Sequence, residues 1–122
     1  MKKIKEIINS NFSFLFDEYG FNFVEKKEYF ENFIVEVKRD NIFFRFIEDR
    51  NDFFLDFTFD NSEWINIYCV LDWLKIKNQI LSKIKPVNKV KNIKRILRQY
   101  IKIILDFIDE EKFDELKNYC KQ

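Results

Sequence analysis

The sequence contains no histidine and no alanine, and it has only one glycine, one proline and two cysteines among 122 residues. Histidine titrates nearest neutral pH and is the commonest metal ligand, so its absence excludes most general-base and metal-site chemistry. A single glycine also excludes the glycine-rich loops that surround phosphate groups. We therefore expect no catalytic residue, no metal site and no cofactor, and a protein that acts by contact.

Long apolar runs are also missing, since none approaches the roughly 18–20 residues that a membrane-spanning helix needs. The charged opening resembles that of a signal peptide, but no long apolar stretch and no small-residue cleavage site follow it. These features predict a cytoplasmic protein that does not bind a membrane. The length and the hydrophobic fraction of 47% predict a single α+β domain over residues 1–122.

The two cysteines, Cys69 and Cys120, lie 51 residues apart. One pair of cysteines does not make the disulfide framework of a small secreted domain. Reactive cysteines usually need a basic partner such as histidine, which this chain lacks. We expect two free thiols without a redox or nucleophilic role.

Phenylalanine, by contrast, is abundant, with sixteen residues. From Ile4 to Tyr19 the apolar side chains recur at spacings of three and four, which predicts a helix over residues 2–19. Gly20 suits the left-handed position that ends a helix. The period then changes, and short gaps rich in Asn and Asp predict hairpins. The four expected strands cover residues 21–28, 33–39, 42–48 and 53–59, with turns at 31–32, 40–41 and 49–52.

Helical spacing returns in the second half of the chain. Asp60 and Glu63 have the spacing of a capping box, which predicts a helix over residues 63–75 with an uneven continuation that Pro86 stops. Asn88 can cap a third helix. We expect the apolar stripe of that helix to run from position 90 to position 108, and residues 109–111 to open a short last helix. The predicted fold is α+β, with an N-terminal helix, a four-stranded antiparallel meander and two to three C-terminal helices on one sheet face.

Alternation along the strands assigns two faces to this sheet. One face is purely apolar and is expected to meet the helices; it consists of Phe33, Val35, Val37, Ile42, Phe44, Phe46, Phe53, Leu55, Phe57 and Phe59. The other face mixes apolar with charged side chains, namely Ile34, Glu36, Lys38, Phe43, Arg45, Ile47, Phe54 and Asp56. It is either a partner-binding face or a face covered by the chain's own C-terminal segment. Trp64 and Trp73 are expected to anchor the core.

Charge is unevenly distributed along the chain. Residues 1–72 hold nine cations and fifteen anions, residues 73–105 hold ten cations and no anion, and residues 106–122 hold three cations and six anions. The net charges are therefore −6, +10 and −3. Such opposite fields bear on the choice of charged partners more than on the fold.

The negative half includes five carboxylates within fifteen residues of each other, from Asp49 to Glu63. Solvated turn residues are the simplest interpretation, and a surface for a basic partner is the alternative. The turn at 49–52 lacks the ligand series and the glycine of a calcium loop. Arg50 in that turn is either a clamp across the hairpin or an interface residue. The candidate partner-binding surface comprises Glu36, Phe43, Arg45, Asp49, Asp52, Phe54, Asp56, Asp60 and Glu63.

The positive segment places a basic stripe on the third predicted helix. Its members are Lys91, Lys94, Arg95, Arg98 and Lys102. A solvated helix face is the default interpretation. An acidic protein partner, pairing with the chain's own acidic half, or a phosphate backbone are the alternatives that remain open.

Short motifs resemble a group of small bacterial proteins. They comprise the Tyr-Gly-Phe step at 19–21, the Asp-Arg turn at 49–50, the apolar strand at 53–57, the Trp-containing segment at 64–67 and the helical segment at 97–104. The group is similar to immunity proteins of polymorphic toxin systems, including contact-dependent growth inhibition. The resemblance implies binding to the C-terminal domain of a cognate toxin, usually a nuclease, and obstruction of its active site. This chain departs from the pattern at Asn51, which stands in place of a glycine.

The leading hypothesis is therefore a cytoplasmic immunity protein whose partner is a cognate toxin domain. A regulator associated with nucleic acid through the basic stripe ranks below it. A hydrolase that uses the acidic cluster would need a metal and ranks last, and we expect no small-molecule substrate.

Overall fold

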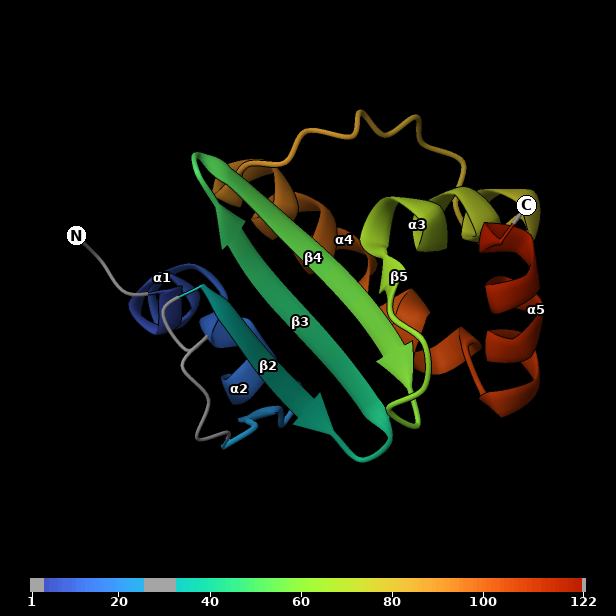
Figure 1. The fold of residues 1–122 in the computed structure, drawn as a ribbon. Helices are drawn as coiled ribbons and strands as arrows, with labels where there is room; N and C mark the ends of the chain where they lie inside the picture. Colours follow the sequence, from blue (N-terminus) through green and yellow to red (C-terminus); the bar gives the residue numbers. More distant parts are fainter. Residues whose placement is uncertain (1–3, 26–32, 122) are drawn as a thin grey trace.

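The computed structural model describes residues 4–25 and 33–121 (Figure 1). The end of the first predicted strand and the predicted turn at 31–32 lie outside these residues. The elements of the described chain are α1 Ile4–Asn11, α2 Ser13–Asp17, β1 Asn22–Phe23, β2 Ile34–Arg39, β3 Ile42–Asp49, β4 Asp52–Phe59, β5 Ile65–Asn66, α3 Ile67–Ile76, α4 Val90–Phe107 and α5 Glu110–Cys120. None of the helices in this part of the chain is long and apolar enough to span a bilayer.

The strands form an antiparallel sheet in the order β1-β2-β3-β4-β5. Helices α2 and α4 lie behind this sheet as Figure 1 is drawn, α1 lies at its β2 edge, and α3 and α5 lie beyond the β5 edge. The α+β class is thus confirmed. The sheet differs from the predicted four-stranded meander by the short strand β5, which pairs Ile65 with Phe57 and Asn66 with Asp56.

Pairing of β5 with β4 also moves the start of the next helix. Asp60 and Asn61 adopt left-handed backbone conformations with φ of 59° and 50°, so the predicted capping box of Asp60 and Glu63 is wrong. The chain instead turns, adds two residues to the sheet edge and begins α3 at Ile67. The side chain of Asn66 caps α3 by accepting a hydrogen bond of 3.0 Å from the Tyr68 amide. Hydrogen bonding at the sheet edge therefore overrides the local capping signal.

The other helix boundaries follow the prediction unevenly. Helix α3 ends at Ile76, so the expected continuation does not form. Helix α4 begins after Lys89 rather than after Asn88, and no side chain caps it. Asp109 caps α5 by accepting a hydrogen bond of 2.9 Å from the Lys112 amide. That bond lowers the pKa of the Asp109 carboxyl from its ordinary value of 3.8.

The predicted N-terminal helix is broken into α1 and α2. Phe12 leaves the helical conformation with φ −123° and ψ 26°. Its ring is fully buried, with its centroid 4.8 Å from that of Phe46 and 6.0 Å from that of Phe53. One continuous helix would project this side chain in a fixed direction, and the break instead allows it to pack against β3 and β4.

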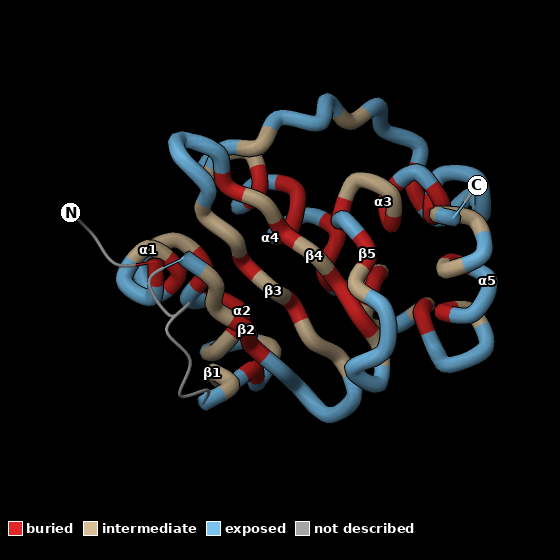
Figure 2. Tube along the Cα trace, in the orientation of Figure 1, coloured by how far each residue is buried: buried red, intermediate tan, exposed pale blue. Residues whose placement is uncertain are grey.

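The apolar sheet face forms the core, as predicted. Phe44, Phe46, Leu55 and Phe57 are fully buried on it, and Figure 2 shows the alternation of buried and intermediate residues along β3 and β4. Phe33 is the exception, since it is 56% exposed just before β2 begins, where no described element covers it.

Of the two tryptophans that were predicted to anchor the core, only Trp73 does so. Trp73 is 2% exposed in the core. Trp64 is not a core residue. It precedes β5 and packs over the opposite face of the sheet, against Arg45 and Phe43.

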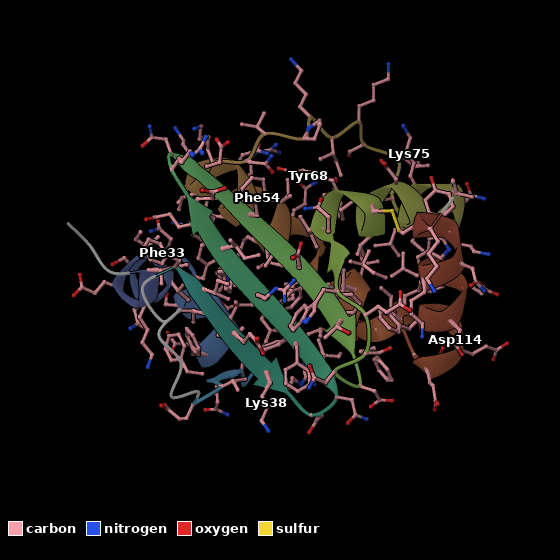
Figure 3. The ribbon with its side chains drawn as sticks, in the orientation of Figure 1. Phe33, Lys38, Phe54, Tyr68, Lys75 and Asp114 are labelled. Atoms are coloured by element: carbon pink, nitrogen blue, oxygen red, sulfur yellow. A yellow bond between two sulfur atoms is a disulfide. The ribbon has the colours of Figure 1, made fainter. Side chains whose placement is uncertain are left out.

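Cys69 and Cys120 form a disulfide between α3 and α5, with their Cα atoms 6.2 Å apart. The expectation of two free thiols is therefore wrong. Helices α3 and α5 pack side by side, and Figure 3 shows the yellow bond joining them. The sequence separation of 51 between Cys69 and Cys120 gave no sign that α3 and α5 are neighbours in the fold. The same packing places the C-terminal helix beside α3 rather than on the outer sheet face.

Two-residue turns join β2 to β3 and β3 to β4. The first residue of each turn, Asp40 and Arg50, adopts a left-handed conformation with φ of 52° and 59°. Gly20 is left-handed with φ 72°, as predicted, but it lies three residues beyond the end of α2 at Asp17, whose C-cap is Glu18. Asp tolerates this conformation well, whereas Arg does not. The side chain of Arg50 is exposed and makes no ion pair or hydrogen bond within the described chain, so it does not clamp the hairpin there.

We expect Arg50→Gly to raise the free energy of unfolding by about 0.5–1 kcal/mol, because glycine relieves the left-handed strain at this position. Arg50→Ala is the matched control, since it removes the side chain but keeps the strained Cβ, and it should give no gain. Urea unfolding of the three proteins measures both effects. A loss of stability in both variants would show that the Arg50 side chain does hold the hairpin.

Candidate functional site

The outer face of the sheet, on the side away from α4, is organised as rows of residues that lie opposite one another on neighbouring strands. These rows are Ile34–Ile47–Phe54, Glu36–Arg45–Asp56–Asn66 and Lys38–Phe43–Thr58. Figure 3 looks onto this face and labels Phe54 on β4 and Lys38 on β2. No helix of the described chain covers it (Figure 1). An apolar row therefore adjoins a charged one on a face that the described helices leave open, although Glu36 and Thr58 on this face are themselves buried.

Arg45 occupies the centre of the charged row. One of its Nη atoms lies 3.1 Å from a carboxylate oxygen of Asp56, and its guanidinium group stacks 4.3 Å from the ring centroid of Trp64. Glu36 lies opposite Arg45 on the other neighbouring strand and is 8% exposed. Asp56 thus holds the arginine to β4, and the row as a whole carries one more negative than positive charge.

Aromatic side chains flank this charged row. Phe43 lies edge-on to Trp64 at 6.5 Å, and Phe54 completes the apolar row on the other side. Phe43, Phe54 and Trp64 are all half-buried, as are Ile34 and Ile47. Half-buried aromatic groups on both sides of a fixed charge are typical of a protein-binding surface. The prediction that Trp64 anchors the core missed its place here, since neither its spacing nor its type distinguishes the two faces.

The predicted acidic cluster does not form one cluster. Asp49 and Asp52 lie at the β3–β4 turn, whereas Asp60 and Glu63 lie beyond the opposite end of β4. Eight residues of extended chain separate the two pairs by about 25 Å. Two of these carboxylates bind lysines of the chain itself, Asp52 with Lys89 and Glu63 with Lys121, each at 3.0 Å. The acids therefore form two separate pairs, one at each end of the outer face.

The basic stripe is confirmed as a solvent-facing surface of α4. All five predicted residues are exposed, whereas Ile93, Ile96, Leu97, Tyr100 and Ile104 on the other side of the helix are buried. An open groove of about 770 Å³ follows the first half of this surface and is lined by Val87, Lys89, Lys91, Asn92, Lys94, Arg95, Arg98 and Gln99. The sequence did not reveal that Lys89 joins the stripe or that the surface is concave.

The segment that precedes α4 is held by a polar network that the sequence did not indicate. Tyr68 on α3 donates a hydrogen bond of 2.6 Å to the Val87 carbonyl, and the Asn92 amide donates one of 2.9 Å to the Tyr68 hydroxyl. Phe53 on β4 donates a backbone hydrogen bond of 2.9 Å to Asn88. Burial raises the pKa of Tyr68 above its ordinary value of 10.0, and this effect exceeds the opposing effects of the hydrogen bonds and of Arg95.

We expect the free energy of unfolding to fall as the pH rises above about 10, because the unfolded chain then loses the Tyr68 proton before the folded chain does. Below that pH both states keep the proton, and Tyr68 makes no pH-dependent contribution. Urea unfolding at several pH values between about 9 and 11 measures the slope. Tyr68→Phe should show a smaller fall than the wild type, and equal slopes would contradict this assignment.

Within residues 4–25 and 33–121, no three Cys, Asp or Glu side chains lie close enough together to hold a metal ion. Comparison of the chain with models of known families, with curated proteins and with solved structures finds no match. The assignment of a function therefore depends on the two surfaces, the outer sheet face and the groove of α4.

Proposed function

We propose that this chain is a non-enzymatic immunity protein, which binds a bacterial toxin domain through the outer sheet face and blocks its active site. The observation that supports the proposal most directly is the set of half-buried aromatic and aliphatic side chains on a face without a covering helix in the described chain. Aromatic anchors of this kind supply most of the binding energy in protein interfaces.

The charges of this face fit the same role. Arg45 and Asp56 neutralise each other at the centre, where a partner would exclude water. Asp49 and Asp60 at the two ends form no ion pair within the described residues. A nuclease needs a basic cleft for its substrate, and acids around an apolar centre can guide such a cleft into place.

The dimensions of the face indicate how much of the molecule a toxin would touch. Strands of eight residues and three strand spacings give roughly 25 Å by 15 Å. A stable interface buries about 800 Å² on each partner, which exceeds this projected area. A bound toxin domain would therefore also reach the hairpin ends, where Asp49 and Asp60 lie.

A toxin that degrades nucleic acid acts in the cytoplasm, and we place the action of this chain there too. Thiols are kept reduced in most cytoplasms. The disulfide of the structure would then be reduced to two thiols in that compartment and would re-form when the protein meets an oxidant. Counting free thiols in denatured protein from rapidly quenched cells tests this placement.

Co-expression with a candidate toxin domain, beginning with any that a neighbouring gene encodes, tests the proposed function. Cells that produce both proteins are expected to grow, whereas cells with the toxin and the Phe43→Ser/Phe54→Ser variant should not. Lys102→Glu, on the opposite side of the molecule, is the matched control and should protect like the wild type. Lack of protection by the wild type, together with lack of a complex, would refute the proposal.

A further inference from the structure

The first half of α4 places cations next to one another on the helix surface, where they repel each other. Lys91 and Arg95, and Lys94 and Arg98, are spaced four residues apart, and like charges at this spacing destabilise a helix. The first turn holds no acidic residue to balance the positive end of the helix dipole. A helix face that only keeps the protein in water would mix both signs of charge. The uniform charge favours a ligand that carries several negative charges.

The two ends of the groove already hold carboxylates of the chain itself. Asp52 binds Lys89 at one end, with 3.0 Å between oxygen and nitrogen. Glu18 binds Arg98 at the other end, where the guanidinium group stacks on the Phe14 ring with 4.8 Å to its centroid. Lys89 and Arg98 are nine residues apart, which corresponds to about 14 Å along a helix. The groove between them therefore has carboxylate partners at its ends and none in its middle.

The middle of the groove offers unpaired cations. Lys91 and Lys94 make no ion pair or hydrogen bond in the part of the chain that the structure describes, and Arg95 donates only to the neighbouring Asn92 side chain. Val87, which is 43% exposed, adds an apolar wall, and the aliphatic stems of the lysines add to it. A ligand that fits this surface presents carboxylates about 5–7 Å apart along one side, as in an extended segment with acidic residues at alternate positions, and also carries apolar side chains.

We propose that this groove binds a short acidic segment of a protein partner, whose carboxylates continue the row between Asp52 and Glu18. A nucleic acid fits less well. No half-exposed aromatic ring lines the groove to stack on a base. The site lies on the helix layer, behind the sheet, and meets the face assigned to the toxin only at the β3–β4 turn, so the inference does not depend on that proposal.

Fluorescence anisotropy of a labelled peptide of about ten residues, in which Asp and Leu alternate, tests the proposal. The wild-type protein is expected to bind the peptide saturably, with an affinity that falls as salt is added. Lys91→Glu/Lys94→Glu should weaken binding at least about tenfold, since two exposed ion pairs are replaced by repulsion. Lys102→Glu is the matched control, because it reverses a charge on the same helix outside the groove, and it should change the affinity less than about twofold.

A peptide with Asn in place of Asp and a single strand of about twenty deoxythymidines complete the experiment. The proposal is overturned if the Asn peptide binds as well as the Asp peptide, or if the wild type binds neither peptide. Tighter binding of the deoxythymidine strand, with displacement of the Asp peptide, would assign the groove to nucleic acid instead. Both charge-reversed proteins should melt no lower than the wild type, so that lost binding is not lost folding.

Discussion

Replacing Cys69 and Cys120 with serine is expected to lower the free energy of unfolding by about 4 kcal/mol. The disulfide closes a loop with a sequence separation of 51, and the chain-entropy relation converts a loop of this size into roughly that loss at room temperature. The effect acts on the unfolded chain, because α5 keeps its other contacts in the folded state. Phe113 and Leu116 remain buried against the core, and Lys77 still binds Glu115 at 3.2 Å.

Urea unfolding of the oxidised wild type, the reduced wild type and the double variant measures this loss. Reduction and substitution should give the same stability within error, because both open the same loop. The single variants Cys69→Ser and Cys120→Ser should match the double variant. Equal stability of the oxidised and reduced wild type would contradict the role assigned to the disulfide.

Truncation of Phe54 on the outer face is expected to weaken binding of the toxin domain by about 2 kcal/mol, or roughly thirtyfold. Phe54 closes the apolar row with Ile34 and Ile47, and its half-exposed ring is not part of the core. Phe43→Ala should have a similar effect, because Phe43 supports Trp64, which in turn covers Arg45. Isothermal titration of the purified proteins gives these affinities directly.

The matched control for both substitutions is Phe33→Ala. Phe33 is 56% exposed, but it lies before β2 and outside the three rows of the outer face. Its truncation should leave the affinity within about twofold of the wild type. Unfolding measurements on the same proteins separate lost binding from lost folding. An affinity that falls as much for Phe33→Ala as for Phe54→Ala would contradict the position of the interface.

Those parts of the fold that depend on local patterns could be predicted from the sequence. The alternation of residues 42–48 and 53–59 predicted both faces of the sheet, and the spacing in residues 90–108 predicted both sides of α4. Gly20 and the Asp40 turn were predictable because left-handed conformations favour these residue types. Each of these signals is contained within a few neighbouring residues.

What could not be predicted depends on contacts between distant segments. The break at Phe12 exists because its ring packs between β3 and β4, and β5 exists because the edge of β4 accepts another strand. The disulfide needs α3 and α5 to be neighbours, which neither helix reveals alone. The acidic residues are likewise close in sequence but distant in space, because the eight residues of β4 place Asp52 and Asp60 at opposite ends of the sheet.

The sequence predicted which strand residues share the outer face, but it did not predict that Trp64 joins them. Glu36, Phe43, Arg45, Phe54 and Asp56 share the outer face because strand alternation already placed them on one side. Trp64 joins them from a loop, where no periodicity could assign it.

Titration of the toxin domain with the purified chain tests the central claim most directly, that this protein acts by obstructing another macromolecule. The rate of the toxin reaction should fall linearly and reach zero at about one equivalent, as for a tight complex with one site. The wild-type chain alone should convert no substrate. An unchanged toxin rate at several equivalents, or turnover by the chain itself, would contradict the account.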